Sequence, residues 1–143
     1  MIGSPVTYSQ AAQGVVVEFT VDPIAIARYV SFDIPTDEGA TSNLALAEVK
    51  VEEITESGSG DTFLAALPLS GNPSRQSSTY NQMRPASEAL DGDRSGLTFS
   101  RTVFELNPWW KVDLVAEYCL GKIRVMNRKH NLVVSDTLGS QNR

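Results

Sequence analysis

The chain has 143 residues, which suits one globular domain able to bury a core of its own. Its 12 basic and 17 acidic side chains give a formal net charge of −5, which argues against a nucleic-acid-binding surface because such surfaces need a basic face. The sequence contains no run of about 18 apolar residues, so no membrane-spanning helix is predicted. Residues 1–8 are too few and too polar for a signal peptide, and the lone Cys119, which excludes an internal disulfide, is expected to be a buried small hydrophobic residue.

Apolar and polar residues alternate through most of the chain, and a period of two indicates strands that are buried on one face. In chain order the alternating segments are residues 15–21, 30–34, 44–51 and 122–125. Turn-forming residues separate them, namely Asp22-Pro23, residues 35–39, Asp91-Gly92-Asp93 and Asn107-Pro108. Only residues 25–27 and 86–90 favour a helical turn. The pattern predicts an all-β fold, an antiparallel β-sandwich.

A stretch between the strand-rich parts has a different composition. Residues 52–78 are rich in Ser, Gly, Thr and Pro, and the run SGSGD at residues 57–61 is typical of a flexible linker. The apolar residues 63–69 are expected to pack as an edge segment. The sequence therefore divides into residues 1–54 and residues 74–143, joined by a linker at residues 55–73.

Both parts carry segments that resemble one known family. The second part contains, in this order, the segments QSSTY (76–80), ASEALDGD (86–93), NPWWKVDL (107–114) and LGKIRVMNR (120–128). The series resembles the opening half of the calcium-dependent, fucose-binding fucolectin (F-type lectin) family. The first part contains ARYVSFDIP (27–35) and LALAEVKV (44–51), which are similar to the closing half. The resemblance implies a discoidin-like jelly roll of the coagulation-factor C-type.

The two halves stand in swapped order, with the closing half first. Three explanations remain open: a fragment spanning the junction of two tandem domains, a circular permutant, or a misassembled gene model. The first and last strands of a sandwich often lie side by side, and closely spaced termini permit permutation. We therefore expect the two halves to pair within this chain, and we favour a tandem-domain fragment that closes as one permuted sandwich.

The turn at Asp91-Gly92-Asp93 is a candidate calcium site. Two aspartates that bracket a glycine can direct several oxygens toward one point, and calcium takes six to eight oxygen ligands. Glu48 interrupts an apolar strand, where an unpaired buried carboxylate would be costly. The resemblance implies a structural Ca²⁺ held by the Ala47 carbonyl, the Glu48 carboxylate, the Glu88 carbonyl, Asp91, Asp93 and the Thr98 hydroxyl. The alternative is a solvated turn and an exposed Glu48.

The resemblance also implies a sugar site, which departs in part from the family pattern. Arg128 matches one of the two arginines with which the family holds fucose, while Ser135 stands near the second. Arg101 stands where the family has a histidine. The candidate carbohydrate-binding residues are Arg101, Arg128 and His130, because a planar guanidinium donates to two hydroxyls at once. The alternative is that these residues are ordinary exposed cations.

The tandem tryptophans, Trp109 and Trp110, lead directly into an alternating strand. A sugar-stacking role is one interpretation of such a pair. We prefer a structural role, in which at least one indole points into the core, because large aromatic side chains contribute most there.

Together these features predict a calcium-dependent carbohydrate-binding module, extracellular, whose partners are cell-surface or microbial glycans. Membrane contact is expected only through glycans, and oligomerisation is left open. The alternative is a non-catalytic, discoidin-like adhesion or structural module without sugar binding. An enzyme is not expected, because the sequence has no Gly-x-Ser-x-Gly elbow, no phosphate-binding loop, no cysteine pair and a single histidine.

Overall fold

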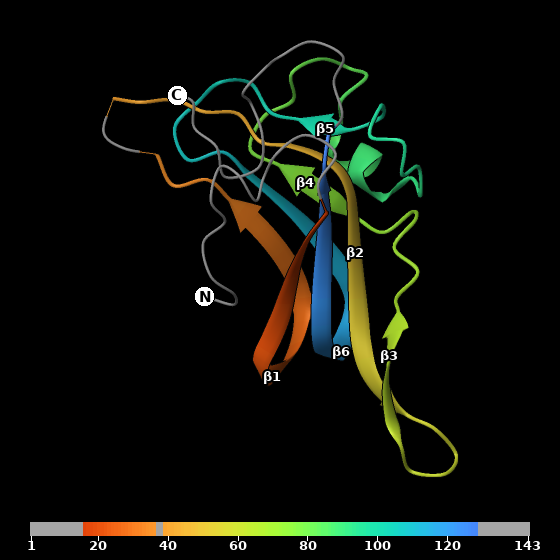
Figure 1. Cartoon of the computed structure of the whole chain (residues 1–143). Coiled ribbons are helices and arrows are strands. Elements are labelled where there is room, and N and C mark those ends of the chain that lie inside the picture. Colours follow the sequence, from red (N-terminus) through yellow and green to blue (C-terminus); the bar gives the residue numbers. More distant parts are fainter. Residues whose placement is uncertain (1–15, 37–38, 129–143) are drawn as a thin grey trace.

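The computed structural model describes residues 16–36 and 39–128, and these form an antiparallel, all-β structure, as the sequence predicts (Figure 1). The elements are β1 (Val16–Asp33), β2 (Ala45–Glu56), β3 (Thr62–Ala66), β4 (Ser74–Gln76), the 3₁₀ helix η1 (Ala86–Leu90), β5 (Ser100–Arg101) and β6 (Trp109–Asn127). Within the described ranges no helix is both long and apolar enough to cross a membrane.

Strand β6 organises the sheet. The main strand order is β1-β6-β2-β3, with β4 added to β6 and β5 added to β2. The β1–β6 ladder extends from Val16 opposite Met126 to Asp33 opposite Trp109. The long, bent strands curl the sheet into a half-barrel, consistent with a sandwich (Figure 1). Since β1 and most of β2 belong to residues 1–54 and β6 belongs to residues 74–143, strands from both parts of the sequence form one sheet.

Two local predictions need correction. Residues 25–27 do not form a helical turn, and Asp22-Pro23 does not end a strand. Strand β1 runs through both, with its register against β6 shifting between Thr20 and Ala25. The reason is tertiary, since β6 offers backbone partners to Ala25 and its neighbours. The helical turn predicted at residues 86–90 is confirmed as η1.

The segment expected to be a linker is more ordered than its composition indicates. Its Ser- and Gly-rich run forms the turn between β2 and β3, closed by the Ser57 N–H, which donates to the Asp61 carbonyl at 2.8 Å. Strand β3 then pairs with β2, and Leu67 and Leu69 are buried in the core. The Ser and Gly residues therefore serve a hairpin turn, and residues 55–73 are not a pliant connector over their whole length.

The core confirms that one tryptophan is structural. Trp110 is 0% exposed, and its indole Nε1–H donates to the Ala86 carbonyl at 3.0 Å. Its ring centroid lies 6.0 Å from that of Phe32. Trp109, by contrast, is 37% exposed. Cys119, which the sequence predicts to be buried, is only partly buried, so that prediction needs correction.

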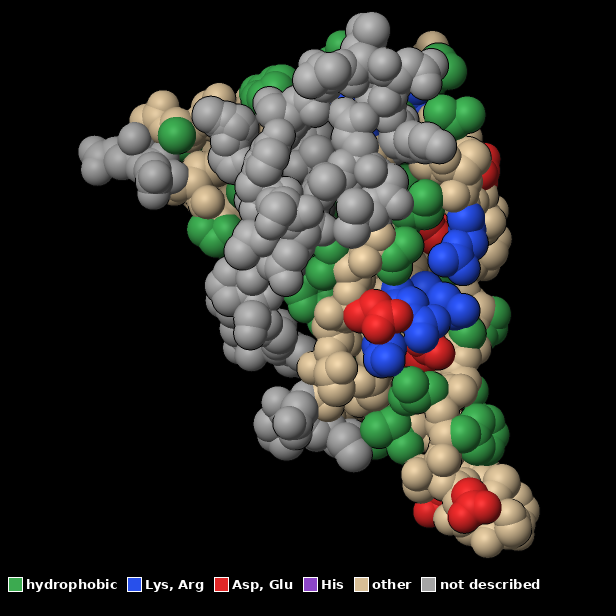
Figure 2. Space-filling view, in the orientation of Figure 1, with side chains coloured by type: hydrophobic (Ala, Val, Ile, Leu, Met, Phe, Trp, Pro, Cys, Tyr) green, Lys and Arg blue, Asp and Glu red, His purple; other side chains and the backbone are tan. Residues whose placement is uncertain are grey.

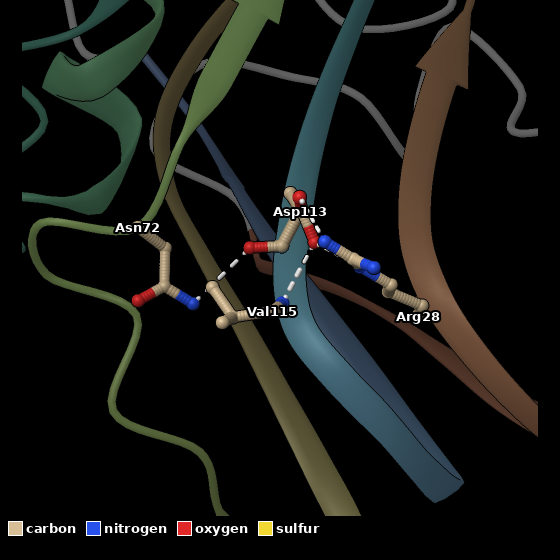
Figure 3. A network of polar contacts seen from close by, with 4 residues as sticks. All are labelled: Arg28, Asn72, Asp113 and Val115. Carbon is tan, nitrogen blue, oxygen red and sulfur yellow. Dashed lines mark hydrogen bonds and ion pairs between the residues drawn. The ribbon is translucent and has the colours of Figure 1, made fainter.

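Strand β6 contains a strained bulge in its middle. Between two pairs of the β1–β6 ladder, Arg28 alone faces residues 114–117, and Val115 has a φ of 75°. Arg28 forms a two-pronged ion pair with the Asp113 carboxylate, with N···O distances of 2.9 and 3.1 Å. The Val115 N–H donates to the same carboxylate at 2.7 Å, and the Asn72 amide donates to the Asp113 carbonyl at 3.2 Å (Figure 3). This network holds the bulge, and the Arg28 hydrogen bond lowers the pKa of Asp113.

Candidate functional site

The turn after η1 is built by its own aspartates. Asp91 caps the C-terminus of η1, and Gly92 follows with a φ of 80°, a conformation that favours glycine. The Asp93 N–H donates to the Asp91 carboxylate at 2.9 Å, and the Ser95 N–H donates to the Asp93 carboxylate at 2.8 Å. The acidic pair that the sequence singles out therefore closes a tight turn.

Strand β2 brings Glu48 to this turn. The Gly92 N–H donates to Glu48 Oε1 at 3.2 Å, across 44 residues of sequence. From the other side, the Thr98 hydroxyl donates to Asp91 Oδ2 at 2.8 Å. Two of the predicted ligand residues, Glu48 and Thr98, are thus joined by hydrogen bonds to the turn that contains two others, Asp91 and Asp93.

The carboxylates around the turn affect one another electrostatically. Burial raises the pKa of Glu48 to about 7; the Gly92 hydrogen bond opposes this, and the charge of Asp91 adds to it. Burial also raises the pKa of Glu88, and a hydrogen bond with Asp91 and the Asp91 charge act in the same direction. The hydrogen bond from Ser95 lowers the pKa of Asp93. Glu48 and Glu88 therefore lie where a nearby cation would favour their charged forms.

The donor set suits calcium chemically, since it consists of carboxylate and hydroxyl oxygens. The arrangement is not a closed cage. Among residues 16–36 and 39–128, no group of three or more His, Cys, Asp and Glu side chains is placed to hold a metal ion. Glu48, Asp91 and Thr98 would hold the ion by exchanging their present hydrogen bonds for it, and the ion would neutralise the crowded carboxylates.

The other predicted ligands take different positions. Ala47 is 0% exposed and packs with Ala45 and Phe99 in a small apolar cluster. Glu88 was assigned a backbone role by the resemblance, but its side chain is the part that interacts with Asp91.

Arg101 lies beside two exposed aromatic rings. Its guanidinium is 4.0 Å from the centroid of Tyr80 and 6.0 Å from that of Phe104. Tyr80 is 50% exposed and Phe104 is 56% exposed. An aromatic face with a guanidinium on it offers stacking and hydrogen-bond donors together. Neither ring could be singled out from the sequence, because both stand in loops without periodicity.

Arg128 is not an ordinary exposed cation. Its side chain is only 2% exposed, and its guanidinium lies 5.2 Å from the centroid of Phe99. Arg84, which the sequence analysis did not single out, lies over the same ring at 3.8 Å. Arg128 thus packs in the interior, and Arg101 is the more accessible of the two predicted arginines. His130 lies outside the described residues.

Comparisons with known proteins do not assign this chain to a family. No protein-family model matches it, and searches of the curated proteins and of the solved structures returned no match. The resemblance to fucolectins therefore stays a prediction from the motifs.

Proposed function

We propose that the chain is a calcium-stabilised, non-catalytic carbohydrate-binding module that acts outside the cell. The ion would be held by Glu48, Asp91 and Thr98, with Glu88 and Asp93 close by. The observation that carries the proposal is the hydrogen bond between Gly92 and Glu48, which joins the two carboxylate-bearing segments. The raised pKa of Glu48 supports it, because a cation would stabilise this carboxylate.

A cation at this turn would also order the sugar-binding surface. Thr98 is three residues before Arg101 in the chain, and β5, which carries Arg101, pairs with the first two residues of β2. Glu48 lies in the same strand, β2. An ion held by Glu48 and the turn would therefore restrain β5 from both sides and fix the Arg101 backbone.

A sugar would be recognised by Arg101 and its two neighbouring rings. The apolar face of a sugar ring can pack on Tyr80 or Phe104, while the guanidinium donates to ring hydroxyls. The contact of the Arg101 guanidinium with the Tyr80 ring, 4.0 Å from its centroid, would reduce the conformational entropy that Arg101 loses on binding. Since Arg128 is buried, its contribution would be to support Phe99 behind this surface.

A protein-binding adhesion module is the second candidate. Exposed apolar side chains stand in the loop before η1 and in the loops on either side of β5, and these are typical of protein interfaces. They include Met83 at 66%, Leu97 at 57% and Leu106 at 54% exposure.

A glycan array in calcium and in chelator separates the two candidates. The lectin proposal predicts binding to a defined set of glycans that chelator abolishes. The Arg101→Ala variant should lose that binding, whereas Arg75→Ala, an exposed arginine in β4, should keep it. Full binding by Arg101→Ala would remove Arg101 from the site, and no binding to any glycan would favour the adhesion module.

A further inference from the structure

A cavity of about 330 Å³ lies beside the turn at Asp91-Gly92-Asp93 and outside the proposed sugar-binding surface. Its apolar walls include Leu67 and Leu69 from the segment after β3, Leu90 from η1 and Met126 from β6. Its volume is at the lower end of the range of small-molecule sites, about 300–1,000 Å³. The cavity is therefore large enough for one small organic ligand.

The charged side chains that line this cavity differ in whether they have a hydrogen-bond or ion-pair partner. Glu48 accepts a hydrogen bond from Gly92, and Asp91 accepts from Thr98 and from the Asp93 N–H.

Three basic side chains line the cavity, and one of them, Arg124, is paired with Glu18 at 2.7 Å and with Glu52 at 3.1 Å. Arg94 acts on Glu48, whose pKa it lowers. Lys50 is different, because no ion pair joins it to an acidic side chain among residues 16–36 and 39–128. Lys50 is therefore the positive charge of this lining that is left for a ligand.

The position of Lys50 adds a second reason for an anionic ligand. Lys50 stands directly opposite Arg124 on the neighbouring strand, and like charges in such a pair destabilise a sheet. Figure 2 shows basic and acidic side chains gathered together on one face of the molecule. Arg124 and Lys122 share Glu18 as their acidic partner. Lys50 remains without a partner of opposite charge among the described residues, so an anion beside it would relieve the repulsion.

We propose that this cavity binds a free organic anion with an apolar body, whose carboxylate, sulfate or sulfonate group pairs with Lys50. The apolar body lies against Leu69 and Met126, and Arg94 adds positive potential. The site is separate from the sugar-binding surface at Arg101, and its occupation does not require that the protein bind a glycan.

A fluorescence titration of the whole chain with anilinonaphthalene sulfonate tests the proposal, and titration calorimetry gives a second measurement of the stoichiometry. The expected result is one saturable site. Lys50→Met, which keeps the length of the side chain, should weaken binding about tenfold, since a charge-assisted hydrogen bond is lost. Lys122→Met is the matched control, because Lys122 stands on the same face but does not line the cavity, and its affinity should be unchanged.

Two further arms complete the test. Ser70→Trp places a large side chain at the exposed lining of the cavity and should abolish binding of the probe without loss of a core residue. The neutral analogue N-phenylnaphthylamine should bind more weakly than the sulfonate. Equal binding of the two probes, or unchanged sulfonate binding by a folded Lys50→Met, would overturn the proposal. So would Lys50-dependent binding to phosphatidylglycerol vesicles without binding of the free sulfonate.

Discussion

The β1–β6 ladder and the region from η1 to β5 are held together in different ways. The ladder pairs two strands of 18 and 19 residues by regular backbone hydrogen bonds, interrupted by register shifts. Between η1 and β5 the chain has no strand, and side-chain bonds from Asp91, Asp93, Ser95 and Thr98 fix its path. The ladder therefore depends on backbone pairing along two long strands, whereas the loop region depends on a few side-chain oxygens, which a cation would reorganise.

The largest effect should come from the core side of the ladder. Trp110→Ala should lower the free energy of unfolding by about 3–5 kcal/mol, because a fully buried indole and its bond to Ala86 are lost. Trp109→Ala is the control; it should cost much less because Trp109 is partly exposed. Urea denaturation measures both, and equal costs would contradict the different roles of the two tryptophans.

The next effect concerns the loop region and depends on pH. The folded chain raises the pKa of Glu48 from 4.5 to about 7, so the folded state holds this proton more tightly than the unfolded chain. The resulting stabilisation is fully present below pH 4.5 and is lost as the pH rises through about 7. Glu48→Gln should reduce this loss, measured as the urea midpoint across this pH window in chelator. Glu56→Gln, at the exposed end of β2, should retain the loss of stability. If the urea midpoint depended on pH equally in both variants, the pKa of Glu48 would not be the cause.

The smallest effect lies in the bulge of the ladder. Val115 is held at a φ of 75°, which costs a residue with a side chain about 1–2 kcal/mol. Val115→Gly should therefore raise stability, by about 1 kcal/mol at most after the entropy cost of glycine. The neighbouring exposed Ala116→Gly should lower it instead. Destabilisation by both changes in thermal unfolding would show that the Val115 conformation is not strained.

The sequence was a better guide to the ladder than to the sites. Alternation predicts the strands of β1, β2 and β6, because burial of one face acts locally on every second residue. It cannot show that β1 continues through Asp22-Pro23, since that depends on pairing with β6.

The sites depend on contacts between distant parts of the chain. The turn at Asp91-Gly92-Asp93 could be predicted from its residues, and its approach to Glu48 followed from the resemblance. Tyr80 and Phe104 beside Arg101, and the burial of Arg128, could not be predicted. Such contacts join loops, whose sequence carries no periodic signal.

The most direct test of the account is the melting temperature of the whole chain in calcium and in chelator. A ligand that binds only the folded state stabilises it by mass action, by about 2.7 kcal/mol at one hundred times its Kd. We predict a rise of several degrees in calcium for the unaltered chain and for the control Asp61→Asn, which changes an exposed acid in the β2–β3 turn. The double variant Glu48→Gln, Asp91→Asn should show no rise. A melting temperature of the unaltered chain that is the same in calcium and in chelator would contradict the calcium site.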